Sequence, residues 1–573
     1  MKKERWVVSA KRADFQAIAD RFGIDPVIAR LIRNRDVTGE KEIEEYLFGD
    51  LEQLHDPLLM KDMERAADLI AEKIREKKPI RIIGDYDIDG VTATYILLTG
   101  LKDLGADADV RIPDRIADGY GLNEHLVQFA ADEGRDTIVT CDNGIAAGSQ
   151  IRLAKELGMT VVVTDHHEVP FEEDENGERR YILPPADAVV NPKQKDCSYP
   201  FPGLCGAAVA WKLIQTMEAK AGIPKEHSFR FLEFVAIATI GDVMDLVGEN
   251  RVFVKKGLEL LKTTKNEGLH ALMQCTGVDT ANLNTYHIGF VLGPCINAGG
   301  RLDTAKRALE LLNASNRREA VTLAADLKEL NDSRKEMTEE GVEEAVRQIE
   351  SSSWKDDQVL VVYLPKCHES IAGIIAGRIK ERYYRPTFVL TRGETGVKGS
   401  GRSIEAYDMF AEMSRCRELF TKFGGHKLAA GLSLEEENVE VFRKRINELA
   451  DLTEDDLQMK VSIDMRLPFP YINEELIHEL KILEPFGKGN GKPLFAESKL
   501  RVIQPRIFGK NRNVLKCRLE DQQGNQMEAV YFGEVEDCLQ QMEKKQIMSF
   551  TYYPSINEYM GRRTIQLTIV NYQ

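Results

Sequence analysis

Acidic residues and histidines follow three short β-rich runs of the sequence. The run at 80–83 is followed by Asp85, Asp87 and Asp89, the run at 137–140 by Asp142, and the run at 160–164 by Asp165, His166 and His167. In open parallel sheets, ligands bind beyond the carboxyl ends of the strands. Packed acids repel one another unless a cation lies between them, and oxygen ligands with one or two histidines favour Mn²⁺ or Mg²⁺. If the runs are neighbouring strands, the sequence predicts a divalent-metal site at their ends.

A fourth acidic position, Asp242, ends the apolar segment that begins at Phe231 and is a candidate for the same site. Asp245 could instead cap a helix or lie on the surface, and the residues alone leave that choice open.

A calcium EF loop is excluded, because the twelfth position counted from Asp85 is Ile96 rather than the glutamate that such a loop needs. Two cations about 3.5–4 Å apart would activate water and stabilise a phosphoryl displacement, so the pattern predicts phosphoester or phosphoanhydride hydrolysis.

These residues need a scaffold, and the pattern of apolar runs predicts an α/β protein of several domains. Strands that alternate with helices predict a parallel sheet, and five late strand-like runs predict a small antiparallel barrel of the OB type. One long stretch follows the helical period, as a connecting helix or a core helix would. The expected parts are a helical segment packed on the first α/β domain (1–75), that domain (76–303), the connecting helix (304–350), a second α/β domain (351–455) and the barrel (460–573).

The composition is that of an ordinary globular chain with an acidic balance. Its 573 residues include 77 Lys and Arg against 93 Asp and Glu, a net charge of −16. This argues against indiscriminate binding of nucleic acid or membranes, although a local basic groove is compatible with it. Nine cysteines without a C-x-x-C pair exclude a disulfide framework and a zinc module, and the charged N-terminus lacks an apolar signal segment. We therefore expect a cytoplasmic protein without a membrane span.

The residues described so far resemble the DHH phosphoesterase superfamily, and further motifs resemble its RecJ branch. Those motifs are Ile112-Pro113-Asp114-Arg115, Gly119-Tyr120-Gly121, Asn297-Ala298-Gly299-Gly300-Arg301, Gly399-Ser400-Gly401-Arg402, Gly424-Gly425-His426 and Pro485-Phe486-Gly487-Lys488-Gly489-Asn490. The resemblance covers most of the chain. It implies a DHH domain, a long helix, a DHHA1 substrate domain and an OB fold, in that order. It also implies a bacterial 5′→3′ exonuclease specific for single-stranded DNA.

The resemblance implies roles for individual residues. Two Mn²⁺ or Mg²⁺ ions would be held by Asp85, Asp87, Asp89, Asp142, His166 and Asp242. The catalytic residues would be Asp142, His166 and His167. The 5′ end and backbone of the substrate would be bound by Arg115, Tyr120, Arg301, His368, Ser400, Arg402, Gly425 and His426.

Four positions depart from the pattern expected of the family. Cys367 stands where a tryptophan is expected and Ser370 where a glycine is expected, on either side of His368. Cys295 replaces a common arginine and Asp245 a common proline. The lost aromatic would weaken a stacking contact but would leave the metal chemistry intact.

Local charge supports a nucleic-acid substrate. From Lys499 to Arg518 the chain has seven basic residues, Lys510 and Lys516 among them, and no acidic one. OB barrels bind single strands through a basic groove with aromatic side chains on which bases stack. Candidate stacking residues are Phe508, Tyr531 and Phe532, although a place in the barrel core is the commoner fate of any single aromatic.

We expect a two-metal exonuclease that releases 5′ mononucleotides from single-stranded DNA in recombination and repair. A phosphodiesterase for short RNAs or cyclic dinucleotides is an alternative, although such relatives are typically shorter and lack the barrel. A non-catalytic replication scaffold is a third hypothesis, which the full set of acidic residues disfavours. By resemblance alone, the partners are single-stranded DNA-binding protein and a RecQ-type helicase, at the bacterial nucleoid.

Overall fold

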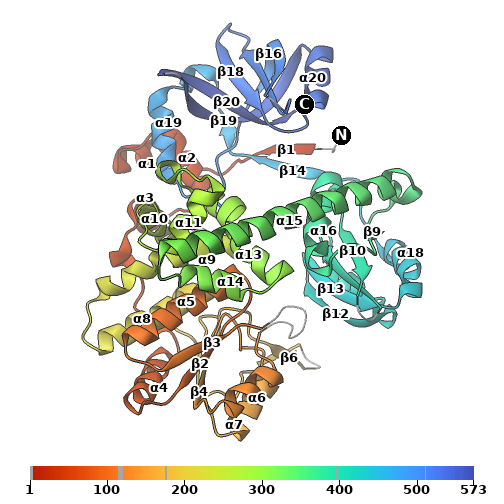
Figure 1. Ribbon diagram of the computed structural model, residues 1–573. Coiled ribbons are helices and arrows are strands. Elements are labelled where there is room, and N and C mark those ends of the chain that lie inside the picture. Colours follow the sequence, from red (N-terminus) through yellow and green to blue (C-terminus); the bar gives the residue numbers. More distant parts are fainter. Residues whose placement is uncertain (1–3, 114–120, 175–176, 394–395, 510, 560) are drawn as a thin grey trace. The chain divides into compact units, whose positions relative to one another are not determined.

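The computed structural model describes residues 4–113, 121–174, 177–393, 396–509, 511–559 and 561–573 (Figure 1). The chain divides into two compact units. The first contains residues 1–4, 55–244 and 256–459, and the second contains residues 5–54, 245–255 and 460–573. The backbone therefore crosses between the units several times. One crossing lies between Met244 and Asp245, and the chain returns from it within a single helix, α10 (Gly248–Leu261).

The first unit begins with a parallel five-stranded sheet. Its strands, in the order β3-β2-β4-β5-β8, are β3 (Ala108–Arg111), β2 (Ile80–Ile83), β4 (Thr137–Cys141), β5 (Thr160–Thr164) and β8 (Ala188–Val190). The three runs predicted from sequence are thus neighbours in the sheet. Because β3 and β4 lie on opposite sides of β2, the strand order reverses beside β2, and this is the place where parallel α/β sheets bind ligands.

Helices cover both faces of this sheet, which explains why its strands are continuous apolar runs. Figure 1 shows α6 (Glu124–Asp132) and α7 (Gly148–Glu156) on one face, and α5 (Ile88–Asp103) with α8 (Gly206–Lys220) on the other. The remaining helices of this part are α4 (Met63–Arg75), α9 (Leu232–Gly241), α11 (Glu267–Thr276), α12 (Thr285–His287) and α13 (Gly293–Leu302), with a π-helical turn at Ile288–Leu292. A short hairpin of β6 (Phe171–Glu173) and β7 (Arg179–Tyr181) follows β5.

The stretch expected as one helix over 304–350 forms two. Helix α14 (Lys306–Leu312) ends before residues 313–316, and α15 (Arg317–Glu350) is a 34-residue helix. The break has a local cause, because the side chain of Asn316 accepts a hydrogen bond from Glu319 N and so starts a new helix at that point. The connecting role predicted for this stretch falls to α15.

A mixed sheet follows α15. Its order is β12-β13-β11-β10-β9, with β10 parallel to β9 and the other neighbours antiparallel. The elements are β9 (Leu360–Tyr363), α16 (Glu369–Tyr383), β10 (Thr387–Arg392), β11 (Val397–Arg402), α17 (Met409–Ser414), β12 (Phe420–His426), β13 (Ala429–Leu434) and α18 (Val439–Leu449). The β9–α16–β10 segment is a parallel crossover unit, so the second α/β domain predicted from sequence is present.

The second unit contains the barrel. Its elements are β15 (Met465–Arg466), α19 (Glu474–Leu480), β16 (Phe495–Phe508), β17 (Val514–Glu520), β18 (Gln526–Tyr531), α20 (Val535–Lys544), β19 (Ile547–Tyr559) and β20 (Arg562–Tyr572). The sheet runs β16-β17-β18-β20-β19 and closes through pairing of β16 with β19. The five strands predicted from the sequence are confirmed, and α20 lies between β18 and β19 in the chain. Two pairs of this sheet are parallel, β15 with β16 and β18 with β20, and its other pairs are antiparallel.

The N-terminal segment differs from the expectation. We expected residues 1–75 to pack on the first α/β domain, but α1 (Phe15–Phe22), α2 (Pro26–Asn34) and α3 (Glu40–Phe48) belong to the second unit. Their buried residues, such as Ile28 and Leu31, share one hydrophobic core with Leu476 and Leu480 of α19. The apolar stripe was visible in the sequence, but an amphipathic pattern does not say which neighbour covers it. Strand β1 (Glu4–Val8) pairs with β14 (Met459–Ile463).

Within the part of the chain that the structure describes, no helix combines the length and the apolar character needed to cross a membrane.

Candidate metal centre and substrate cavity

The first three aspartates lie where β2 turns into α5. Asp87 is the N-cap of α5, and its Oδ1 accepts hydrogen bonds of 3.0 Å from the backbone N–H groups of Asp89 and Gly90. Asp89 is buried in the first turn of α5 and accepts from Gly206 N at 2.6 Å and Ala207 N at 2.7 Å. These two N–H groups begin α8, so the carboxylate also complements the positive end of that helix. The Asp-rich turn thus has fixed side-chain orientations before any ligand binds.

Asp142 follows β4 in a backbone conformation that is unusual for its type. Its φ is +60°, in the left-handed region, and its side chain is buried. Gly206 lies directly against it, because a Cβ placed on Gly206 would be 2.7 Å from the Cβ of Asp142. Only glycine at position 206 therefore lets α8 approach this carboxylate so closely.

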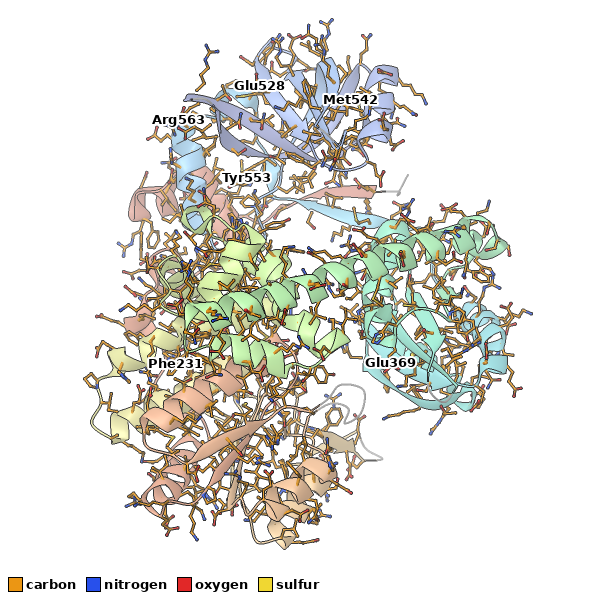
Figure 2. All side chains as sticks on the ribbon, viewed as in Figure 1. Phe231, Glu369, Glu528, Met542, Tyr553 and Arg563 are labelled. Carbon is orange, nitrogen blue, oxygen red and sulfur yellow. The ribbon has the colours of Figure 1, made fainter. Side chains whose placement is uncertain are left out.

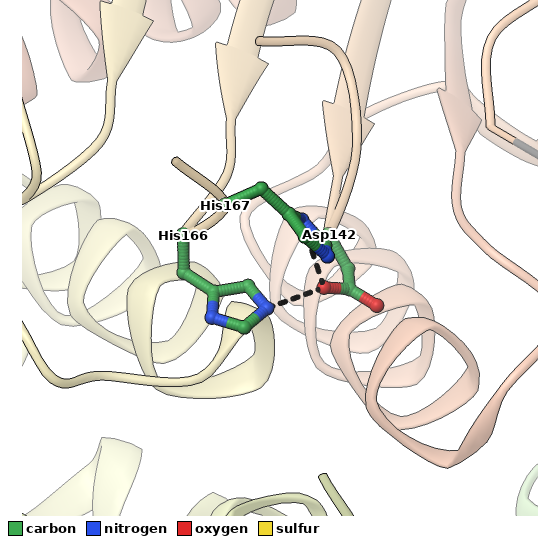
Figure 3. A group of neighbouring side chains, drawn as sticks. All are labelled: Asp142, His166 and His167. Carbon is green, nitrogen blue, oxygen red and sulfur yellow. Dashed lines mark ion pairs between the residues drawn. The ribbon is translucent and has the colours of Figure 1, made fainter. Parts of the chain in front are cut away.

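His166 and His167 converge on Asp142 (Figure 3). The Nε2 atom of His166 lies 3.0 Å from Asp142 Oδ1, and Nδ1 of His167 lies 4.0 Å from the same oxygen. His166 Nε2 is also 3.5 Å from Asp89 Oδ2 and 3.7 Å from Asp242 Oδ2. The ends of β2, β4 and β5 and the end of α9 therefore meet at one point.

Three groups of side chains in this crevice have ligand atoms within 4.8 Å of one another. The groups are Asp142 with His166 and His167, Asp89 with His166 and Asp242, and Asp85 with Asp87 and Asp142. Asp142 and His166 each belong to two groups. The cluster is therefore continuous and contains every side chain that the sequence singled out as a metal ligand.

Burial shifts the pKa values of the clustered side chains away from their usual values. Burial, together with the charge of Asp87, raises the pKa of Asp85 to about 7. Burial, with the charges of Asp242 and Asp87, raises the pKa of Asp89 to about 8, and burial with the charge of Asp89 raises the pKa of Asp142 well above its usual value. Burial and the neighbouring His167 lower the pKa of His166 to about 3. The imidazole is therefore neutral, as a metal ligand must be, while the acids hold their negative charge poorly without a cation.

The cluster passes a test of fit for a hard divalent cation. Both carboxylate oxygens of Asp85 are buried, and the backbone N–H groups of Tyr86 and Gly121 offset only part of the effect of burial on its pKa. Buried oxygens of this kind are costly unless they bind something positive. Carboxylate oxygens with one or two imidazole nitrogens suit Mn²⁺ and Mg²⁺.

Two residues that the sequence analysis did not assign orient this cluster. Asp165 is buried, and its Oδ1 lies 2.7 Å from His167 Nδ1, so it fixes the imidazole in the way that second carboxylates support histidine ligands. Burial would raise the pKa of Asp165, but the hydrogen bond and charge of the His167 side chain, together with hydrogen bonds from the backbone N–H groups of Ile145 and His167, lower it. Asn297 on α13 accepts from Ile88 N at 2.9 Å and so holds the Asp-rich turn. Both residues lie in motifs that carry the family resemblance, and these motifs were the sequence signal that could have identified them.

A cavity of about 750 Å³ lies in the same unit and contains three of the expected substrate-binding residues: Arg301, Ser400 and Arg402. Arg301 donates from Nη1 to the carbonyl oxygen of Ser370 at 2.9 Å, which ties α13 to the start of α16. Arg402 donates from Nη1 to Ser400 Oγ at 3.2 Å. The cavity thus presents two guanidinium groups and a hydroxyl, a set that suits phosphate oxygens.

The remaining cavity wall comes from α16 and the edge strand β12. Glu369, labelled in Figure 2 at the start of α16, lies 2.8 Å from Lys398 in an ion pair on the wall. His368 caps α16 and its Nδ1 lies 2.7 Å from Ser370 Oγ, so the serine that replaces the expected glycine gives this histidine a partner. Cys295 is buried, and its Sγ donates to Val291 O.

Gly425 and His426 lie on β12, next to cavity residue Gly424. Gly425 has a φ of +151°, and a Cβ there would be 2.4 Å from Ala429 O, so the close approach of β13 requires glycine. His426 is exposed. Arg115, Tyr120 and Lys510 lie outside the described residues.

Two of the three candidate stacking residues of the barrel are exposed, although a place in the core is commoner for an aromatic side chain. Phe508 and Phe532 are 47% and 60% exposed, so a core position is wrong for both. The Nζ atom of Lys516 lies 5.6 Å from the centre of the Phe508 ring. Tyr531 packs against the barrel core and edge-on against Tyr572, with ring centroids 5.5 Å apart. A cation beside an exposed ring therefore exists at Phe508.

Family models match three parts of the chain. They are the DHH family, N-terminal domain (residues 79–239), the DHHA1 domain (356–451) and the RecJ OB domain (463–571). The single-stranded-DNA-specific exonuclease RecJ of Bacillus subtilis (strain 168) is 36% identical over 99% of this chain and 70% of its own length. Its namesake from Escherichia coli (strain K12) is 33% identical over 96% of both chains.

A solved structure agrees with these matches. The crystal structure of RecJ in complex with Mn²⁺ from Thermus thermophilus superposes with a TM-score of 0.84 at 28% identity, and the alignment covers all of this chain and 80% of that one. A second structure of that protein, in complex with Mg²⁺, gives a TM-score of 0.78 at 26% identity. The fold, the three domain matches and the full-length relatives agree, and this chain belongs to the RecJ family of the DHH superfamily.

Proposed function

We propose that this chain is a metal-dependent exonuclease that releases mononucleotides from the 5′ end of single-stranded DNA. The observation that carries the proposal is the continuous cluster of buried carboxylates and imidazoles at the switch point of the parallel sheet. The cavity lined by Arg301 and Arg402 in the same unit adds a site of suitable charge for the substrate backbone. The relatives from Bacillus subtilis and Escherichia coli are single-stranded-DNA-specific exonucleases.

Asp85, Asp87, Asp89, Asp142, His166 and Asp242 would hold two Mn²⁺ or Mg²⁺ ions in this proposal. When bound, such a pair lowers the pKa of water and stabilises the attacking and leaving oxygens of a phosphoryl displacement. Asp142 reaches both ends of the cluster and so keeps its parts at a fixed spacing. Asp165 holds His167 by its Nδ1, which leaves Nε2 of His167 to meet the phosphoryl group.

Polarity would come from recognition of the 5′ phosphate. Arg301, Ser400 and Arg402 line the cavity and offer donors that match phosphate oxygens. His368, Gly425 and His426 lie on the elements that form its wall. Arg115, Tyr120 and Lys510 complete the proposed set by resemblance. The barrel surface around Phe508 and Lys516 would also bind single-stranded DNA.

By family membership we also propose action in recombination and repair at the bacterial nucleoid. A helicase of the RecQ type would supply the strand, and single-stranded DNA-binding protein would be a second partner. Both partners are proposed by resemblance to the family alone.

The test is degradation of end-labelled oligonucleotides with Mn²⁺. We expect release of 5′ mononucleotides, loss of activity when the 5′ end is blocked, and full activity when the 3′ end is blocked. Equal rates on both blocked strands would contradict the polarity. Deletion of the barrel is a poor test, because residues 5–54 and 245–255 share its unit and would lose their core.

A further inference from the structure

The carboxyl end of β8 lies beside the loop that carries the two histidines of the metal cluster. β8 runs parallel to β5, with Val190 opposite Thr164, and Asp165 N donates to Val190 O at 3.0 Å. Both strands therefore end at the edge of the sheet where parallel α/β proteins bind ligands. Residues 191–194 follow β8 at this edge and are not part of the metal cluster.

Two buried amide side chains fix this segment. Asn191 donates from Nδ2 to the carbonyl oxygen of His167 at 2.9 Å and accepts from Lys193 N at 2.8 Å. Gln194 donates from Nε2 to Val189 O at 2.7 Å. Because buried hydrogen-bonded groups are costly to displace, the backbone of Lys193 is held in one place next to the histidine loop.

The side chain of Lys193 lies at the rim of the crevice. Its Nζ atom is 2.9 Å from Oε1 of Glu168, the residue directly after His167. The Glu168 side chain is 86% exposed, whereas that of Lys193 is 24% exposed. Burial and the charges of His167 and Lys193 lower the pKa of His166, so the ammonium group is close enough to act on the cluster. Lys193 is thus a partly buried cation whose partner is almost entirely in water.

The cluster would remain negatively charged after metal binding. Its proposed ligands include five carboxylates, those of Asp85, Asp87, Asp89, Asp142 and Asp242. Two divalent ions supply only four positive charges, and each phosphate of the substrate adds a further negative charge. Since like charges repel strongly near buried groups, a cation at the rim lowers the free-energy cost of bringing the strand to the ions.

We propose that Lys193 binds a backbone phosphate of the single strand at the rim of the crevice and that Glu168 competes with that phosphate. An ion pair with so exposed a carboxylate adds little stability, so the ammonium group exchanges Glu168 for an oxygen of the phosphate. Lysine binds phosphate as a point charge, and the exchange therefore needs no rearrangement of the backbone that Asn191 holds. The inference rests on the proposed function and adds to it a substrate-binding residue and its competitor.

The exchange differs from a merely structural ion pair in the signs of two substitutions. If the pair only stabilised the loop, removal of either side chain would have the same effect on the protein. In the exchange, Lys193→Gln removes the group that binds phosphate, whereas Glu168→Gln removes the anion that competes for that group. The two variants should therefore change substrate affinity in opposite directions.

Cleavage of a 5′-labelled oligonucleotide by the full-length protein at saturating Mn²⁺ measures these effects. We expect Lys193→Gln to raise KM roughly tenfold, the loss that one hydrogen bond to a charged group produces. Glu168→Gln should lower KM about twofold, since an exposed ion pair is weak. The matched controls are Lys195→Gln and Glu172→Gln, at exposed positions of the same charge, and both should keep the wild-type KM. Opposite shifts support the exchange, and any other pattern overturns it.

A substrate with one uncharged linkage tests for direct contact. A methylphosphonate, in which a methyl group replaces a charged phosphate oxygen, is placed at successive linkages behind the first. At the contacted linkage we expect the wild-type KM to rise roughly tenfold and that of Lys193→Gln not to rise further, because the partner is already absent. Equal sensitivity of the two proteins at every linkage would overturn the contact.

Two further variants separate the inference from a general defect of the loop. Lys193→Arg keeps the charge, so its KM should stay within a factor of about three of the wild type, and a KM like that of Lys193→Gln would overturn the inference. Glu168→Gln changes a side chain that is almost fully exposed, so it should fold even if Lys193→Gln does not, and an unchanged or raised KM in this variant would overturn the exchange.

Failure of the proposed function is a different outcome from failure of this inference. The former would appear as an absence of Mn²⁺-dependent cleavage by the wild type. Cleavage by the wild type with an unchanged KM in Lys193→Gln would refute only the role of Lys193.

Discussion

The metal crevice of the first unit and the barrel surface of the second unit hold their candidate ligand-binding groups in opposite ways. In the crevice, Asp89 and Asp142 are buried and fixed by helix ends, a tight glycine contact and neighbouring histidines. On the barrel, Phe508 is about half exposed and Lys516 lies beside its ring. Burial makes charge interactions strong and geometry fixed, whereas exposure makes them weak, screened and tolerant of different bases. We therefore expect the crevice to determine the rate of cleavage and the barrel to contribute substrate affinity.

The largest expected effect comes from removing one carboxylate of the crevice. Asp142→Asn keeps the shape of the side chain but removes the charge shared by two of the three ligand groups. We expect kcat on a 5′-labelled oligonucleotide to fall by about 10³-fold or more. Because an ion that binds only the folded state stabilises it, Mn²⁺ should also raise the melting temperature of the wild type but not of the variant. An exposed control is Asp132→Asn on α6, and comparable activity of the two variants would contradict the comparison.

Glu233 is a buried acid outside the crevice and shows the effect of burial on a carboxyl group. Burial raises the pKa of Glu233 to about 7, a rise that the hydrogen bond from Thr264 Oγ1 only partly offsets. The folded state therefore binds the proton more tightly than the unfolded state, whose pKa is 4.5. The stabilisation is complete below that value and is lost as the pH rises through about 7.

Glu233→Gln mimics the neutral acid, so its free energy of unfolding should match that of the wild type at acidic pH. Above pH 7 the variant should be more stable by roughly 3 kcal/mol, since each unit of pKa shift corresponds to about 1.4 kcal/mol. Urea unfolding at several pH values measures this, with exposed Glu226→Gln as the control. Stability curves of wild type and Glu233→Gln that run parallel with pH would show that this carboxyl group is not held neutral.

The same contrast explains what could be predicted from the sequence. The crevice was predictable because ligands sit at strand ends, so Asp85, Asp142 and His166 needed only the order of three runs. The break before α15 was missed because Asn316 looks like any polar residue of an amphipathic helix until its cap is seen. The place of α2 was missed because Ile28 and Leu31 show that a face is buried, without showing which core buries it.

Details of the barrel surface were harder to predict for a related reason. A strand that alternates inward and outward side chains exposes every second residue, and a register shift at the irregularity between Ile503 and Arg506 in β16 changes which ones those are. Phe508 is exposed as a consequence of that register, which no local pattern announces. Asp165 and Asn297 show the complementary limit in the crevice, since motif recognition found them but only geometry showed what they orient.

The barrel side of the comparison is tested by Phe508→Ala. Loss of a ring on which a base stacks costs about 1–3 kcal/mol of binding, so KM for a long oligonucleotide should rise roughly tenfold while kcat stays within a factor of about two. Tyr471→Ala is the control, an exposed aromatic outside the basic segment of the same unit. A fall in kcat at unchanged KM would place Phe508 in the chemical step and would break the division between rate and affinity.

The smallest effect concerns Lys516 and appears in the salt dependence rather than in the rate. An exposed lysine that contacts one phosphate contributes by releasing a counterion, and for single strands each such contact adds roughly 0.7 to the slope of log affinity against log salt concentration. Lys516→Gln should therefore reduce that slope by about this amount and weaken binding most at low salt, whereas exposed Lys544→Gln on α20 should leave the slope unchanged. The crevice offers no such dependence, because its charges are buried and screened little by ions in solution. A change in slope for Lys516→Gln with an unchanged kcat would thus separate the two regions by their electrostatics alone.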